Sequence, residues 1–140
     1  MTKKYKILSK FIKDLSSETP DFETYMFVKD NVSKYQLDIN INSKALKNKI
    51  IEINTILKFE DKKKNEKKSH FEIIFATIIQ IDNDIKEKKD LEKIILCDVQ
   101  NEIYLDLENT FLNLLHNSGY PDIKIEKKID FEELYKQKFN

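Results

Sequence analysis

The chain has 140 residues, a formal net charge of zero and 25 basic residues, all of them lysine, so no overall field attracts nucleic acid or an anionic membrane. Its single glycine excludes Walker loops, dinucleotide-binding fingerprints and nucleophile elbows, and its single cysteine excludes an internal disulfide and a cysteine-based zinc site. With no secretory leader and no apolar run of about 20 residues, the sequence predicts one cytoplasmic domain spanning residues 1–140.

Alternation of apolar and polar residues predicts four β-strands in the first part of the chain. The alternating segments span residues 5–13, 35–42, 49–60 and 70–82. The first segment is partly apolar on both faces, whereas each of the others has one clearly apolar face. Residues 61–69 join the last two segments as a short, lysine-rich loop, which predicts antiparallel pairing. Because no aromatic residues interleave with these lysines, a solvated loop tip is favoured over a phosphate-binding loop.

A cluster of apolar side chains between the first two strands has no clear period. Phe22, Tyr25, Met26 and Phe27 crowd into residues 20–33, a segment that is too long for a hairpin loop and too apolar for a free linker. Two interpretations stay open. The segment is either a crossover packed on its own domain or a surface that binds another chain.

Helical spacing replaces the alternation from about residue 90 to residue 117. Two neighbouring apolar stripes, the second of which includes Leu105 and Leu112, together cover about 240° of this helix. Since a helix lying on one sheet needs only about 100–150° of apolar arc, the excess favours burial against a second subunit. Gly119 and Pro121 are expected to end the helix.

A second, shorter amphipathic helix is expected near the C-terminus. Asp130 can cap this helix, and Phe131, Leu134 and Tyr135 then fall on one apolar stripe. The helix either packs on the body of the domain or forms a movable flap beside a hydrophobic groove.

No constellation of residues indicates catalysis. The two histidines, His70 and His116, are far apart in the sequence, and no motif pairs either of them with a nucleophile. We therefore expect no enzymatic activity, no cofactor and no bound metal.

Three local patterns, in order along the chain, resemble those of the SecB family of bacterial protein-export chaperones. They are FIKDLSSETP at residues 11–20, IYL at 103–105 with the helix end GYP at 119–121, and IDFEELY at 129–135. The resemblance implies an α+β fold with a four-stranded antiparallel sheet and with a long helix and a short C-terminal helix packed on one face. It also implies a homotetramer, in which strand edges join two chains and the long helices join two dimers.

The function implied by the resemblance is that of an export chaperone. Such a protein binds unfolded preproteins in hydrophobic grooves, keeps them competent for translocation and hands them to SecA. The resemblance implies no enzymatic activity, no nucleic-acid partner and no insertion into a membrane. Two other functions stay open: a SecB-like chaperone dedicated to a toxin–antitoxin pair, and a small-ligand or lipid-binding α+β domain that uses the apolar cleft as a pocket.

Site residues follow from the same resemblance and from the apolar segments. SecA binding is expected at Asp14 and Glu18, with Ile74 standing where the family has a third acidic residue and Glu72 close to it. The seam between dimers is expected at Leu105 and Leu112 of the long helix. Client binding is expected at the apolar residues of the crossover and the last helix: Phe22, Tyr25, Met26, Phe27, Phe131, Leu134 and Tyr135.

Overall fold

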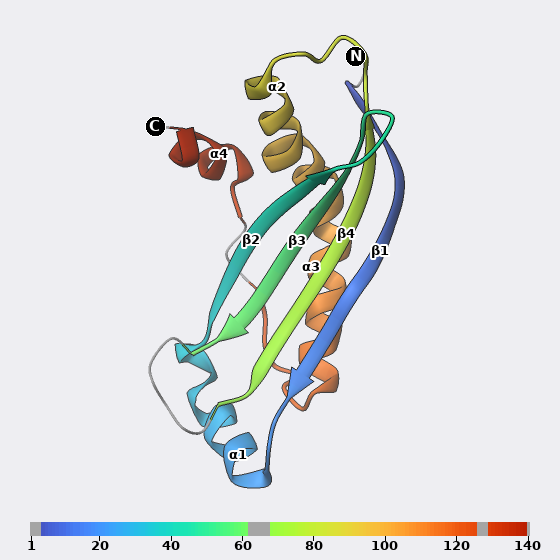
Figure 1. Cartoon of the computed structure of the whole chain (residues 1–140). Coiled ribbons are helices and arrows are strands. Elements are labelled where there is room, and N and C mark those ends of the chain that lie inside the picture. The colour runs from blue at the N-terminus through green and yellow to red at the C-terminus, as the bar shows by residue number, and fades with distance from the viewer. Residues whose placement is uncertain (1–3, 62–67, 126–128, 140) are drawn as a thin grey trace.

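The computed structural model describes residues 4–61, 68–125 and 129–139, so most of the expected lysine-rich loop lies outside the described residues. Four antiparallel strands form one sheet in the order β1-β4-β3-β2, and helices cover one of its faces (Figure 1). The strands are β1 (Tyr5–Glu18), β2 (Gln36–Ala45), β3 (Ile50–Glu60) and β4 (His70–Ile81). This arrangement confirms the α+β fold expected from the sequence. None of the helices in the described ranges is long and apolar enough to cross a membrane.

The mixed apolar pattern of β1 has a structural cause. Its pairing with β4 shifts in register between Ile7 and Ser9 and again between Ile12 and Asp14, as at β-bulges. Each shift moves the following residues to the other face of the sheet. Uninterrupted alternation over residues 5–13 would put Phe11 on the same face as Ile7. Because of the first bulge, Ile12 shares the helix-covered face with Ile7 instead, so the alternation expected for this segment is wrong beyond that bulge.

The crossover between β1 and β2 contains a helix that the sequence pattern did not predict. Helix α1 (Phe22–Asn31) begins after Asp21, whose Oδ1 accepts a hydrogen bond from the Thr24 amide at 2.7 Å. A short 3₁₀ turn, η1 (Val32–Lys34), leads from α1 to β2. Thr24 and Val28 are the buried residues of α1. Because so few of its positions are buried, the apolar residues of α1 show no helical period.

The long helix is continuous from residue 88 to residue 117 but changes its winding. It consists of α2 (Lys88–Lys93), the π-helical segment η2 (Ile94–Asp98) and α3 (Val99–Asn117). Near the π segment, the buried side chain of Gln100 donates to the Ile95 carbonyl at 3.2 Å and accepts from Thr55 Oγ1 at 2.9 Å. These bonds give a fully buried amide its partners and join the helix to β3.

The first apolar stripe of the long helix fills the core, as expected. Four of its residues are fully buried and belong to one cluster with the inward-facing side chains of β3 and β4: Val99, Ile103, Leu107 and Phe111. The second stripe is only partly covered, because Leu112 is half-buried and Leu105 is 70% exposed. One chain therefore does not bury the whole apolar arc of this helix.

Gly119 follows the long helix in a backbone conformation that glycine adopts most easily. Its φ is +108°, and an added Cβ would lie 2.6 Å from Cε1 of Tyr25. We expect Gly119→Ala to lower the free energy of unfolding by about 2 kcal/mol or more, because backbone strain and displacement of the Tyr25 ring add together. Urea denaturation measures this change. Asn117→Ala, two residues earlier and exposed, is the control, and an equally small effect of both substitutions would contradict the prediction.

Helix α4 (Phe131–Phe139) packs beside the first half of the long helix. Phe131 is 2% exposed, and its ring meets that of Tyr104 edge to face, with 5.3 Å between the centroids. The amide of Glu133 donates to Asp130 Oδ1 at 3.1 Å, which confirms the expected cap. The helix is thus held at its first turn by one buried ring and one capping side chain.

Candidate functional site

A groove runs between the helix-covered face of β2 and the segment that leads into α4. Its main hollow has a volume of about 740 Å³. The apolar lining comes from both sides: Tyr35, Leu37, Ile39 and Phe59 from the sheet, and Ile125, Ile129 and Leu134 from the C-terminal part. A second hollow of about 160 Å³ shares Ile39 and Leu134 with the first and extends to Leu96 and Tyr135. Together the two hollows form what we call the β2 groove.

The position of β2 in the sheet leaves this face open. β2 is an edge strand, and its inward residues Leu37, Ile39 and Ile41 alternate with polar ones. The long helix packs over the middle of the sheet, where the inward-facing residues of β3 and β4 are buried. The three apolar residues of β2 are consequently only half-buried.

The backbone of β2 adds hydrogen-bonding groups to the same groove. β2 pairs with β3 without a register shift, and just beyond its end the Leu46 amide donates to the Ile50 carbonyl at 2.8 Å. Because the direction of hydrogen bonding alternates along an antiparallel strand, Leu37, Ile39 and Ile41 turn their N–H and C=O groups to the outer edge. No strand in the described part of the chain pairs with that edge. The same three residues thus offer apolar side chains and open backbone groups.

The groove is apolar inside and charged at its exposed rim. Burial raises the pKa of Tyr35, so its phenol stays neutral at physiological pH. The charged lining residues Lys124, Asp130 and Glu133 are all exposed to solvent. Among the described residues no cluster of three or more histidine, cysteine or acidic side chains could hold a metal ion. These properties suit an uncharged, extended chain as the bound species.

Two of the three residues expected on the last helix line the groove. Leu134 is 38% exposed, and Tyr135 is half-buried, with its hydroxyl donating to the Lys89 carbonyl at 3.3 Å. Phe131 has a different role, because its ring is buried against Tyr104. It anchors α4 and so positions the other two residues.

The residues expected in the crossover lie on α1, at the other end of the sheet from α4 (Figure 1). Phe22 is 73% exposed, Met26 is 40% exposed and Phe27 is half-buried. Tyr25 donates from its hydroxyl to the Gly119 carbonyl at 2.8 Å, which ties α1 to the end of the long helix. Within one chain α1 and α4 therefore do not face each other, so these two helices do not form the two walls of one groove.

The second wall comes from residues that the sequence analysis did not assign to the site. Leu37 and Ile39 of β2 take this place, together with Ile129 before α4. The alternation in residues 35–42 showed that one face of β2 is apolar. Only the position of β2 at the edge of the sheet shows that no helix fully covers that face.

The outer face of the sheet carries the expected acidic pair. Asp14, Ser16 and Glu18 pair in that order with Ile74, Glu72 and His70 of β4. Directly paired residues share a face, so Asp14, Glu72 and Glu18 all lie on the face opposite the helices. In addition, Oε2 of Glu72 lies 3.3 Å from Nε2 of His70. The sheet thus brings a third carboxylate between the two expected ones.

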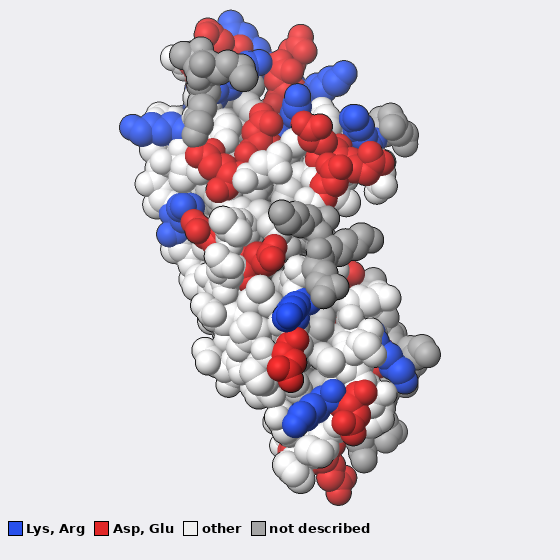
Figure 2. All heavy atoms as spheres, turned by 180° about the vertical axis from the view of Figure 1, so that it is seen from behind, with Lys and Arg blue, Asp and Glu red and all other residues white. Residues whose placement is uncertain are grey.

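Apolar surface also remains on the side that carries the helices. Leu105 on α3 is 70% exposed, and Leu8, Ile12 and Leu15 on the edge strand β1 are each exposed by 43–44%. Figure 2 shows an uncharged region along one border of this side, with acidic residues gathered toward the end that carries α2 and α4. Uncovered apolar surface of this kind is typical of an interface with another chain.

The whole chain, residues 1–140, matches the family described as Preprotein translocase subunit SecB. A protein of Pelagibacter ubique (strain HTCC1062), described provisionally as protein-export protein SecB, is 63% identical over 140 residues, which is 100% of each chain. The protein-export protein SecB of Methylocella silvestris is 22% identical over 130 residues, which is 93% of this chain and 79% of that relative.

A solved structure shares the fold. It is the SecB-like chaperone of Mycobacterium tuberculosis in complex with a ChAD peptide from the HigA1 antitoxin. The TM-score is 0.62 at 10% sequence identity, and the match covers 89% of this chain and 91% of that one. At so low an identity the likeness concerns the fold alone.

Proposed function

Because the chain belongs to the SecB family of protein-export chaperones, we propose that it binds extended segments of unfolded preproteins in the cytoplasm and hands them to SecA. Members of this family are chaperones and not enzymes, which confirms the expectation that the chain has no enzymatic activity. In the proposal the working form is a homotetramer, and the client lies in the β2 groove.

The observation that carries the proposal is the coincidence of apolar walls and open backbone groups in the β2 groove. An extended client segment adds to the edge of β2 as an antiparallel strand, and its alternate side chains enter the space between Ile39 and Leu134. Main-chain hydrogen bonds do not depend on the client's sequence. Each apolar side chain that leaves water contributes about 1.5–3 kcal/mol. Affinity without sequence specificity follows, as a chaperone of unfolded chains requires.

The exposed side of α1 is a second client surface in this proposal. Phe22, Tyr25, Met26 and Phe27 offer aromatic rings and a flexible thioether, which adapt to side chains of different shape. α1 and the β2 groove lie at different parts of the sheet, so one short peptide does not fill both. A long client that reaches both surfaces, or the surfaces of several subunits, gains affinity through a high effective concentration.

Backbone methylation of a peptide tests strand addition directly. A peptide with alternating apolar and polar residues places its apolar side chains in the groove, and in an antiparallel pair the same residues direct their N–H groups to β2. We expect N-methylation at the apolar positions to weaken binding by about tenfold or more, because several hydrogen bonds are lost. Methylation at the polar positions is the matched control.

Fluorescence anisotropy of the labelled peptides measures both affinities. Equal affinities of the two methylated peptides would argue against strand addition but not against client binding. Failure of the unmodified peptide and of an unfolded preprotein to bind would exclude the proposed function.

The acidic residues of the outer sheet face form the proposed SecA contact. We expect the double substitution Asp14→Lys with Glu18→Lys to abolish SecA binding, because it reverses the charge on both sides of Glu72. Client binding is expected to persist, since these residues lie on the face opposite the helices. Surface plasmon resonance at low and high salt measures the interaction, which should weaken with ionic strength.

A charge-matched control accompanies that pair. Asp84→Lys with Asp122→Lys changes the net charge equally at two exposed positions that are not among the paired residues of β1 and β4. If SecA binding survives the double substitution at Asp14 and Glu18, the contact must lie elsewhere on the protein. The same conclusion follows if the control substitutions weaken SecA binding equally.

Two alternative functions would use the same apolar surfaces to bind a different ligand. A chaperone dedicated to an antitoxin would bind one partner, as the mycobacterial SecB-like chaperone binds its antitoxin peptide, and would fail to hold unrelated unfolded proteins. A small-ligand or lipid-binding domain would appear in native mass spectrometry as a ligand-loaded monomer. The proposed export chaperone is expected to appear as a ligand-free tetramer that holds several unrelated clients.

A further inference from the structure

A buried glutamine joins the two sides of the second hollow of the β2 groove. Gln100 of α3 is fully buried; its Oε1 accepts from Thr55 Oγ1 at 2.9 Å, and its Nε2 donates to the Ile95 carbonyl at 3.2 Å. Thr55 of β3 pairs directly with Ile41 of β2, which lines the hollow. Ile95 precedes Leu96 in η2, and Leu96 lines the hollow as well. One side chain therefore binds the immediate neighbours of residues on both sides of this hollow.

The wide winding of η2 is stabilised by the same side chain. The Val99 amide donates to the carbonyl of Ile94, five residues back instead of the four of an α-helix. A turn widened in this way leaves one carbonyl without an amide partner, and a buried carbonyl needs another donor. The side chain of Gln100 donates to the Ile95 carbonyl within this turn. It thus stabilises the π turn against regular α-helical winding.

The π turn decides which side chains of the long helix face the groove. An α-helix turns by about 100° per residue, so one extra residue in a turn rotates the preceding side chains by about that angle relative to α3. Helix α4 contacts η2, and the Tyr135 hydroxyl of α4 donates to the Lys89 carbonyl of α2 at 3.3 Å. The places of Leu96 and Tyr135 in the second hollow therefore both depend on the winding of η2.

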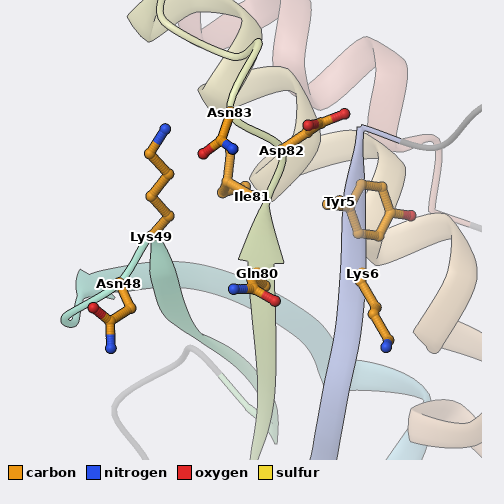
Figure 3. A pocket seen from close by; sticks show the side chains of 8 residues that line it. All are labelled: Tyr5, Lys6, Asn48, Lys49, Gln80, Ile81, Asp82 and Asn83. Carbon is orange, nitrogen blue, oxygen red and sulfur yellow. The ribbon is translucent and has the colours of Figure 1, made fainter.

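The connection from the sheet into α2 is fixed at its start. Figure 3 shows Asp82 and Asn83 where the chain leaves β4, beside the start of β1 at Tyr5. The Asp82 amide donates to the Lys4 carbonyl at 2.9 Å, and the Ile85 amide donates to the Asp82 carbonyl at 3.1 Å. Because the sheet holds this connection and the core holds α3, a change in the winding of η2 is expected to move α2 and the residues packed on it.

The second hollow has the size of one apolar side chain. Its volume is about 160 Å³, and an apolar cavity of about 150 Å³ accommodates benzene. A client side chain that enters this hollow contacts Ile39 and Ile41 on the sheet side and Leu96 on the helix side. A gap of about 0.5–1 Å already loses a quarter to a half of each dispersion contact. A small displacement of the helix side would therefore weaken the binding of a client.

From these contacts we propose that Gln100 is a positioning residue for client binding. By holding the π turn against β3, it sets the distance between Leu96 and β2 and keeps the second hollow open for one client side chain. Two directional hydrogen bonds specify one helix position, whereas apolar packing alone tolerates small shifts. A preformed hollow also lowers the cost of ordering the groove when a client binds. This inference rests on the proposed function, because it concerns the same groove.

The double variant Gln100→Leu with Thr55→Val tests the proposal without leaving a side-chain partner of the bridge unpaired. Tm is expected to change little, because both partners become apolar side chains of similar size and the turn can rewind to the regular α form. The affinity for the peptide with alternating apolar and polar residues is expected to fall by about tenfold, because Leu96 then leaves the hollow. Fluorescence anisotropy measures the affinity, and thermal denaturation gives Tm.

A matched control exists on the neighbouring strand. Thr77 of β4 is fully buried, and its Oγ1 has no hydrogen-bond partner in the described part of the chain. Thr77→Val therefore makes the same chemical change as Thr55→Val without breaking the bridge to Gln100. Client affinity should stay unchanged in this variant, and Tm should not fall.

Leu96→Ala shows whether Gln100 acts through the side of the groove. This substitution alone should weaken client binding by about tenfold. Adding Gln100→Leu with Thr55→Val should then weaken it little further, because the side chain that Gln100 positions is already gone. Losses that multiply would overturn the proposal, and so would an unchanged affinity of the double variant. If the wild-type chain binds neither the peptide nor an unfolded preprotein, the proposed function fails, and this inference fails with it.

Discussion

Leu134→Asp is expected to weaken the binding of an unfolded preprotein by about tenfold to a hundredfold while leaving Tm nearly unchanged. Leu134 is 38% exposed in the chain, so little stability depends on it. A client strand beside β2 would cover this side chain on the wall opposite Ile39. Losing one buried leucine costs about 1.5–3 kcal/mol of binding free energy, and the new carboxylate must also be desolvated.

A matched control exists at the turn after β2. Leu46 is 43% exposed and lies outside the β2 groove, so Leu46→Asp makes the same chemical change at similar exposure. Fluorescence anisotropy gives the affinities, and light scattering of an aggregating client gives the holding activity. Unchanged binding in Leu134→Asp, or an equal loss in Leu46→Asp, would remove the client from this groove. Ile39→Asn on the facing wall should reproduce the loss.

Leu105→Lys is expected to convert the tetramer into a dimer that remains folded. Leu105 is 70% exposed on α3, so a lysine is tolerated in the single chain. In a seam between long helices the same lysine is buried without a partner, and an unpaired buried ion costs several kcal/mol at each copy. A homotetramer contains four copies of residue 105, so the substitution introduces this free-energy cost four times. Light scattering after gel filtration measures the mass.

Leu112→Lys is expected to act in the same direction but also to lower Tm, because Leu112 is half-buried and packs against the core of its own chain. Gln137→Lys adds a lysine at an exposed position of α4 and is the control. A wild-type chain that is monomeric at micromolar concentration would refute the assembly. A tetramer that survives Leu105→Lys would place the seam on another surface.

Much of the fold followed from the periodicity of apolar residues. Segments with one buried face alternate clearly, so β2, β3 and β4 were predicted close to their observed limits. β1 was predicted too short, since its two bulges interrupt the alternation. α1 was missed because a helix that buries only Thr24 and Val28 carries almost no periodic signal. The π turn η2 was missed as well, since one wider turn barely changes the spacing of an apolar stripe.

The candidate site was predicted less completely than the fold. Leu134 and Tyr135 were expected beside a groove, and they do line one. The expected client-binding residues of α1 do not face this pair, because the facing wall belongs to β2. The sequences of two apolar segments do not show whether the segments face each other in the folded chain. That depends on which end of the long helix each segment contacts.

The sequence by itself determined the class of the protein: an α+β domain of the SecB family, without catalytic motifs and with more apolar arc on its long helix than one sheet can cover. Those properties depend on local spacing and on motifs, which a sequence displays directly. Only the tertiary structure decided that Glu72 lies between Asp14 and Glu18, and that β2 is the open edge beside α4. Strand order and bulges place these residues, and both arise from contacts between segments far apart in the chain. No local pattern records such contacts.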